Sequence, residues 1–123
     1  MGGAGLILRR GVWLVYLVVW TAALTTPQPA RVSAEALPAD AQFGAAKSLH
    51  VCAYALLCAL TAWQRFLTPR WRQLLLLALS GHAVLTEVIQ LYVPLRHGCW
   101  EDVALDHIGL YLGVVVAWRW WRE

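Results

Sequence analysis

The apolar residues of the chain are concentrated in four long runs with polar segments between them. The runs cover residues 11–25, 48–63, 73–93 and about 103–121. Each run is nearly continuous, and a stretch of about 20 apolar residues is typical of a helix that crosses a bilayer. The first run is short for a span, and residues 5–7 or a locally thin membrane would supply the missing length. The pattern predicts an all-α fold with four transmembrane helices in a small bundle.

The segments between the runs carry the helix-breaking and charged residues. Residues 26–46 hold three prolines, and we predict a loop there. Residues 64–72 form a linker with three arginines, and a short polar loop around Arg96 follows the third run. These segments predict the connections between the four helices.

A secretory signal peptide is an alternative interpretation of the first run, because residues 32–34 resemble a cleavage site. The apolar run ends well before that site. We therefore expect the first helix to be retained in the mature protein.

The basic residues are distributed unevenly between the segments. Seven fall in the N-terminus, the linker 64–72 and the C-terminus, and three fall in the other two loops. Basic residues are enriched on the cytoplasmic side of membrane proteins, so the asymmetry predicts that both termini are cytoplasmic. Five of the seven acidic residues lie on the opposite, outer side. The seven basic residues are Arg9, Arg10, Arg65, Arg70, Arg72, Arg119 and Arg122, and the three are Arg31, Lys47 and Arg96.

The composition favours a membrane protein and argues against a nucleic-acid partner. Hydrophobic residues make up 60% of the chain and charged residues 14%, whereas a soluble domain is about a quarter charged. The length of 123 residues allows one domain. The net charge of +3 is not gathered into a basic stripe with stacking aromatic residues, so we predict no nucleic-acid binding. The three cysteines show neither disulfide nor zinc-site spacing.

Polar side chains recur at helical spacing near the outer ends of three predicted helices. Positions three, four or seven apart share one helix face, so each set forms a stripe. Because all three stripes lie at the outer ends of their helices, we expect them at the same level of the membrane. The stripes are Lys47, His50 and Tyr54; Glu87 and Gln90; and Asp102 and Asp106 with Gly109 and Gly113.

Glu87 is the most informative of these residues, because it lies well inside the end of an apolar run. A carboxylate at the middle of a transmembrane helix costs about 2.5–3.5 kcal/mol, whereas a hydrogen bond between such helices returns about 0.6 kcal/mol. This favours a polar pocket open to the outside, with Arg96 folded over it, above the alternative that the polar residues only hold the bundle together. Gly109 and Gly113 form a pair of small residues on one face, and we expect that face to pack against another helix.

The histidines are interpreted without a metal. We expect His50 to bond with Glu87 or Asp106, although a histidine beside several carboxylates offers the ligand types of a hard or borderline divalent ion. His82 is expected to be a satisfied interior side chain, and His107 is expected to lie at the membrane interface. We therefore predict no metal and no cofactor.

The polar stripes together resemble the VanZ-like family of small bacterial membrane proteins. The resemblance covers residues from about 45 to 117. It divides the chain into an N-terminal helix with an outer loop (1–44), a VanZ-like domain with three transmembrane helices (45–117) and a cytoplasmic tail (118–123). The family usually has Asp where this chain has Ala46, and Asn where it has Asp106. The resemblance rests on Lys47-x-x-His50-x-x-x-Tyr54, Glu87-x-x-Gln90, Pro94-x-Arg96, Asp102, Gly109 and Gly113, in that order.

The resemblance implies a multi-pass protein of the cell membrane and hence of the bacterial envelope. The family takes its name from a protein associated with resistance to the glycopeptide teicoplanin, and its biochemical mechanism is not agreed. We expect a non-catalytic protein whose outer pocket binds a membrane lipid headgroup, a lipid-linked cell-wall precursor or a glycopeptide. The alternatives are an intramembrane enzyme, with Glu87 or Asp102 as general base and His50 as general acid, and a small transporter. A homo-oligomer is compatible with the sequence.

Overall fold

The computed structural model describes residues 2–27, 38–64 and 68–123, and these residues form helices and connecting segments with no strand. The prediction of an all-α fold is confirmed for this part of the chain. The helices are α1 (Gly3–Thr25), α3 (Ala39–Trp63), α4 (Pro69–Gln90), α5 (Trp100–Val116) and α6 (Trp118–Arg122).

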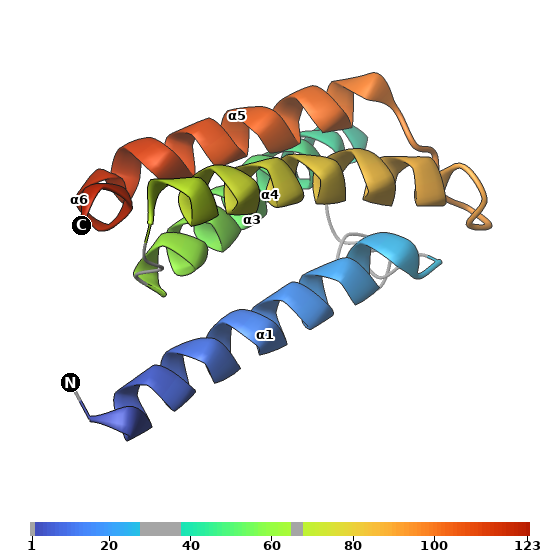
Figure 1. Ribbon diagram of the computed structural model, residues 1–123. Coiled ribbons are helices and arrows are strands. Elements are labelled where there is room, and N and C mark those ends of the chain that lie inside the picture. The colour runs from blue at the N-terminus through green and yellow to red at the C-terminus, as the bar shows by residue number, and fades with distance from the viewer. Residues whose placement is uncertain (1, 28–37, 65–67) are drawn as a thin grey trace.

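α3, α4 and α5 lie side by side, and α1 crosses them at an angle (Figure 1). Successive long helices run in opposite directions, so both chain ends lie at one end of the molecule and the α4–α5 loop lies at the other. We refer to the end with the α4–α5 loop as the loop end. α3 and α5 form the tightest pair, and α4 packs mainly against α5. α1 contacts α3 in both of its halves: the Arg9 guanidinium donates to the backbone oxygen of Trp63 at 3.4 Å, and the Trp20 ring lies against Tyr54.

Three helices, α1, α3 and α4, are long and apolar enough to cross a membrane. α5 has 17 residues, or about 26 Å at 1.5 Å per residue, and the hydrocarbon core of a bilayer is about 30 Å thick. Acidic residues occupy its first turn, and the helix is interrupted at Ala117 before α6 begins. The structure therefore supports three spans where the sequence pattern predicts four.

α3 begins earlier than the sequence pattern predicts. The range 26–46 is predicted as a loop, but the helix starts at Ala39. Pro38 directly precedes the first turn, where a missing N–H is tolerated, and the alanine-rich residues after it favour a helix. Residues 28–37, which include Arg31 and the cleavage-like sequence, lie outside the described residues.

α4 is displaced towards the N-terminus relative to its predicted range of 73–93. It begins at Pro69 and ends at Gln90. The Thr68 side chain accepts a hydrogen bond from the backbone N–H of Trp71, and proline is well suited to the first helical position. These start signals precede the first residue of the apolar run, which explains the difference.

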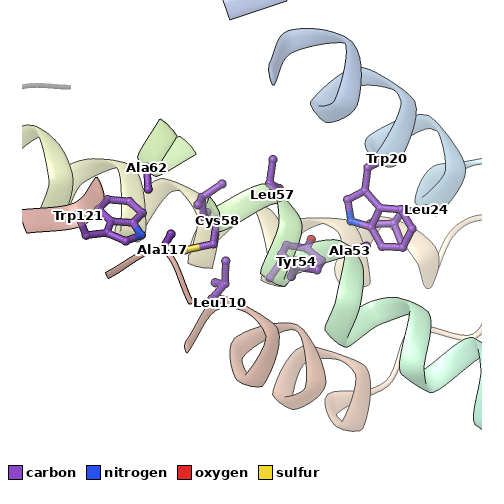
Figure 2. Close-up of a cluster of buried hydrophobic side chains, with 12 residues drawn as sticks. Trp20, Leu24, Ala53, Tyr54, Leu57, Cys58, Ala62, Leu110, Ala117 and Trp121 are labelled. Carbon is purple, nitrogen blue, oxygen red and sulfur yellow. The ribbon is translucent and has the colours of Figure 1, made fainter. Parts of the chain in front are cut away.

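The buried apolar side chains form one narrow cluster along α3 (Figure 2). Tyr54, Leu57 and Cys58 are fully buried near the middle of the cluster. Trp20 of α1 lies beside Tyr54, and Trp121 of α6 lies beside Cys58 further along the cluster (Figure 2). Most other large apolar side chains point outward. This distribution is expected when lipid covers the outside of the bundle.

α5 approaches α3 closely because two of its glycines face that helix. A Cβ at Gly113 would lie 2.5 Å from the Cβ of Cys58 and 2.6 Å from the backbone oxygen of Ala55. A Cβ at Gly109 would lie 3.0 Å from the Cβ of Tyr54. Contacts this short do not fit a side chain, so the two glycines set the distance between the helices.

Polar contacts add to the apolar packing of Trp20 and Leu24 in holding α1 against the other helices. The indole N–H of Trp13 donates to Oγ1 of Thr61 at 2.9 Å, and the hydroxyl of Tyr16 donates to the backbone oxygen of Ala53 at 2.8 Å. A polar group without a partner would face hydrocarbon at these positions. The hydrogen bonds therefore fix where α1 lies on α3.

We expect Gly113→Ala to lower the stability of the protein by about 1–3 kcal/mol, because the added methyl group overlaps α3. Gly81→Ala is the matched control, since a Cβ at Gly81 in α4 meets no atom within 4 Å. The control should keep or raise the stability, because alanine favours a helix over glycine. Thermal unfolding of both purified variants in detergent measures the difference. An unchanged midpoint for Gly113→Ala would contradict close packing at this face.

Candidate functional site

The three predicted polar stripes come together at the loop end of the molecule. Lys47 lies in α3, Glu87 near the end of α4 and Asp102 in the first turn of α5. The Lys47 ammonium forms an ion pair with Oδ1 of Asp102 and lies 3.9 Å from the carboxylate of Glu101, whose side chain is exposed. We refer to five residues of this region as the carboxylate cluster: Lys47, His50, Glu87, Asp102 and Asp106.

His50 lies between two aspartates of α5. Its Nδ1 is 2.8 Å from Oδ1 of Asp106, and its Nε2 is 3.9 Å from Oδ2 of Asp102. Asp106 is fully buried, and its Oδ2 has no hydrogen-bond partner among the described residues. An ionised carboxylate only accepts hydrogen bonds, so the short contact places the proton of a neutral His50 on Nδ1. The lone pair of Nε2 then remains on the side of Asp102.

The loop between α4 and α5 folds back over Glu87. The backbone N–H of Cys99 donates to Oε2 of Glu87 at 3.2 Å, whereas Oε1 has no partner in the described part of the chain. Gly98 lies against the backbone oxygen of Glu87, where a Cβ would overlap it. Only 4% of Glu87 is exposed. Gln90, one turn further along α4, is also buried and its amide nitrogen is likewise unpartnered.

A cavity of about 100 Å³ adjoins Glu87. Pockets that hold a whole small molecule usually measure about 300–1,000 Å³, so this one has room only for a small terminal group. Apart from Glu87, its lining is mainly apolar and comes from α4, the α4–α5 loop and the start of α5: Val84, Val88, Leu91, Gly98, Cys99, Trp100 and Val103.

Tyr54 connects this region to α1 through His82. The Tyr54 hydroxyl lies 2.9 Å from Nδ1 of His82, and Nε2 of His82 lies 2.8 Å from Oγ1 of Thr21. Both ring nitrogens of His82 are therefore bonded, as expected of an interior histidine. The Trp20 ring contacts Tyr54 and His50 edge-on, at 6.1 and 6.0 Å between centroids. The sequence pattern does not predict these contacts of Trp20 and Thr21, because both residues lie in the uncharged run 11–25.

Arg96 is directed to the end of α1. Its guanidinium donates from Nε to the backbone oxygen of Thr26 at 3.0 Å and from a terminal nitrogen to that of Ala23 at 2.5 Å. Carbonyl groups at the end of a helix lack partners within it and attract cations. Burial lowers the pKa of Arg96, and the Glu87 carboxylate opposes part of that shift. The guanidinium thus caps α1 while remaining within electrostatic reach of Glu87.

His107 links α4 and α5 outside the carboxylate cluster. Its Nε2 lies 2.7 Å from Oγ of Ser80, and its Nδ1 lies 2.7 Å from the backbone oxygen of Val103. His107 is therefore held between two helices, and its position relative to the membrane interface stays a prediction. Its partner Ser80 lies midway along α4, and a single serine in an apolar run is the signal that sequence reasoning missed.

The carboxylate cluster holds more negative than positive charge. Glu87, Asp102 and Asp106 are each at most 9% exposed, and the Lys47 ammonium pairs with Asp102. With His50 neutral and the three carboxylates ionised, these five residues carry a net charge of −2, which the Arg96 guanidinium outside the cluster opposes only at Glu87. Buried charge without compensation is costly, so a proton, a cation or a cationic ligand is required to balance it.

We expect Lys47→Met to destabilise the protein by about 1–3 kcal/mol, because it leaves the Asp102 carboxylate without its counter-ion. The loss should be smaller than for a fully buried pair, since 22% of the Lys47 side chain is exposed. Lys47→Met combined with Asp102→Asn should recover most of the loss, because the second change removes the orphaned charge. Thermal unfolding of the single and double variants measures the coupling. Simply additive losses would contradict a coupled pair.

The comparison with known proteins found a match to a family that extends well beyond the carboxylate cluster. No curated protein and no solved structure matches the chain. The family described as VanZ/LLP1 matches residues 12–122, a wider range than the 45–117 on which the resemblance of the polar stripes rests. The predicted family is thereby confirmed. With its match running from within α1 to the end of α6, this chain belongs to the VanZ/LLP1 family.

Proposed function

We propose that this protein is a multi-pass membrane protein of the bacterial cell envelope that binds a lipid headgroup or a lipid-linked cell-wall ligand at the carboxylate cluster. The family and the three helices long enough to span a bilayer support its location in a membrane. The binding function is supported by the charge of the cluster and by the cavity beside it.

The observation that carries this proposal is the state of the Glu87 carboxylate. The residue is 4% exposed, lies one turn from the end of an apolar helix and leaves Oε1 without a partner. A buried ionisable side chain in a membrane helix is costly, and a single backbone hydrogen bond from Cys99 offsets only part of that cost. A purely structural contact would not require this residue. A ligand that pairs with Oε1 accounts for the cost.

The cavity suits the junction between a headgroup and its lipid chain. Its one charged lining residue is Glu87, and the remainder of the lining is chiefly apolar. Leu91 and Trp100, at its edge, are strongly exposed on the outside of the bundle. We infer that a terminal polar group enters the cavity and approaches Glu87, while the apolar part of the ligand lies against the exposed side chains.

For the topology, we propose that both termini are cytoplasmic and that α5 is a fourth, short membrane helix. The two chain ends lie at the same end of the molecule, opposite the loop end (Figure 1). Arginines gather at the end with the termini, and the carboxylates gather at the loop end. Positively charged segments remain in the cytoplasm, so the loop end would face outward. Of the arginines counted from the sequence, Arg31 and Arg65 lie outside the described residues.

An intramembrane enzyme is the second candidate, and one contact favours it. Acid–base chemistry needs a titrating group held within hydrogen-bond reach of a second one. The 2.8 Å contact between His50 and Asp106 satisfies that condition. In this alternative His50 acts as general acid and Glu87 or Asp102 as general base on a lipid-linked substrate. Turnover of labelled envelope lipids by the purified protein separates it from a binding protein.

A role in glycopeptide resistance rests on the family resemblance alone. The observation that addresses it is the teicoplanin susceptibility of cells with and without the gene. We propose the binding function independently of that phenotype.

We expect a cysteine introduced at Gly2 to be protected from an impermeant maleimide in intact cells, and a cysteine introduced at Asp40 to react. The background should have the three native cysteines replaced. Permeabilised cells, in which both positions should react, are the control. Labelling of Gly2→Cys in intact cells would overturn the proposed orientation. A shortened mature chain would instead show that the first helix is removed as a signal peptide.

We expect Glu87→Gln to keep or raise the stability of the protein but to lose at least tenfold of the lipid that co-purifies with it. The amide keeps the shape of the side chain and removes the costly charge. Glu101→Gln is the matched control, because 81% of that side chain is exposed and it should change neither property. Thermal unfolding and mass spectrometry of bound envelope lipids are the measurements. Full lipid binding by the Glu87 variant would leave the carboxylate as a structural contact and refute the proposal.

A further inference from the structure

We propose that the carboxylate cluster binds one divalent transition-metal ion, with His50, Glu87 and Asp102 as its protein ligands. This inference goes beyond the proposed headgroup binding, and it does not depend on it. It also revises the assignment of no metal that the sequence pattern favours, because the three residues come from three different helices and only the fold brings them together.

The distances between the three side chains fit a site that closes around an ion. One ligand atom from each residue lies within 4.8 Å of the other two. Nε2 of His50 and Oδ2 of Asp102 are 3.9 Å apart. Two ligands at about 2.1 Å from a tetrahedral ion lie about 3.4 Å from each other, so small side-chain rotations suffice to reach bonding distance.

Each side chain has an atom available for the ion. Nδ1 of His50 and Oδ1 of Asp102 are engaged by Asp106 and Lys47, which leaves Nε2 and Oδ2 towards each other. Oε2 of Glu87 accepts the backbone N–H of Cys99, and Oε1 is unpartnered although the residue is 4% exposed. A buried carboxylate oxygen without a partner among the described residues offers a position that an ion can bind. This observation is independent of the clustering of acidic residues.

Asp106 supplies the outer contact that metal-binding histidines usually have. A ligating imidazole typically donates its other ring N–H to a carboxylate, which fixes the tautomer and the ring orientation. The 2.8 Å contact between Nδ1 of His50 and Oδ1 of Asp106 has this arrangement. With the ring proton on Nδ1, the lone pair is on Nε2, which is the nitrogen nearer to Asp102.

The charge of the cluster matches a divalent ion. Glu87, Asp102 and Asp106 against Lys47 leave two negative charges when His50 is neutral, and one divalent cation brings the total to zero. A single imidazole with two carboxylates suits zinc, manganese or iron, whereas magnesium and calcium favour sites made of oxygen alone. Three protein ligands leave a coordination position open. If the proposed headgroup binding also holds, an oxygen of that ligand would occupy the open position.

The test is titration of the purified protein with Zn²⁺ by isothermal calorimetry, in detergent, without added lipid and without a histidine tag. The protein is first treated with EDTA and dialysed. We expect one Zn²⁺ per chain, and a loss of affinity of at least about tenfold in Glu87→Gln and in His50→Ala. Glu101→Gln and His97→Ala, which alter an exposed carboxylate and an exposed histidine, should bind within about twofold of the unaltered protein.

Circular dichroism of each variant shows whether it remains helical, and Glu87→Gln keeps the test valid if His50→Ala does not fold. Absence of Zn²⁺ binding by the unaltered protein would overturn the metal site, as would equal binding by Glu87→Gln and Glu101→Gln. Either result leaves lipid binding to be judged by its own assay. Zn²⁺ binding in a protein that captures no envelope lipid would support the metal site and refute the headgroup proposal.

Discussion

The close approach of α5 to α3 is the constraint on which the rest of the structure depends. Gly109 and Gly113 lie on the same face of α5 as Asp102 and Asp106, one to three turns further along the helix. Because the two glycines have no side chains, the helix backbones come together there. Asp102 and Asp106, in the other half of the same face, then contact Lys47 and His50. A wider separation would break the 2.8 Å contact of His50 with Asp106. Packing in one half of the helix thus positions the charges in the other half.

The surrounding medium explains why so many polar groups in this chain are paired. Within a bilayer, an unpaired polar side chain faces hydrocarbon, so contacts such as Ser80 with His107 and Thr21 with His82 are needed to place those residues inside the bundle. The exceptions are therefore informative. Six buried side-chain atoms of the described residues have no partner. Oε1 of Glu87, Nε2 of Gln90 and Oδ2 of Asp106 lie towards the loop end, and the others are Nε1 of Trp20, Oε1 of Gln64 and Nε1 of Trp121. The two carboxylate oxygens among these atoms both belong to the carboxylate cluster, and a buried carboxylate without a partner is the most costly of these groups.

The sequence predicts the helices and their polar faces well, because periodicity is a local property of the chain. It does not predict partners that depend on how helices cross. Arg96 bonds to the end of α1, and His107 bonds to Ser80, and neither choice can be read from spacing along one helix. Hydropathy also misjudges the length of α5, because a run of apolar residues does not register the interruption at Ala117. The metal-like grouping of His50 with carboxylates is visible in the sequence only as residue types, since its geometry requires three helices.

The aspartate at position 106 matters more than its buried position suggests. The VanZ-like family usually has Asn there, and an amide would still accept the hydrogen bond from Nδ1 of His50. It would, however, remove one of the three buried negative charges. With Asn, a divalent ion in the cluster leaves one positive charge, which an anionic group such as phosphate would neutralise. With Asp106, the same ion leaves the cluster neutral and gives no charge-based preference for an anion. If the cluster binds both the proposed ion and the proposed headgroup, we expect that headgroup to carry less negative charge at the cluster than it would in a chain with Asn at position 106.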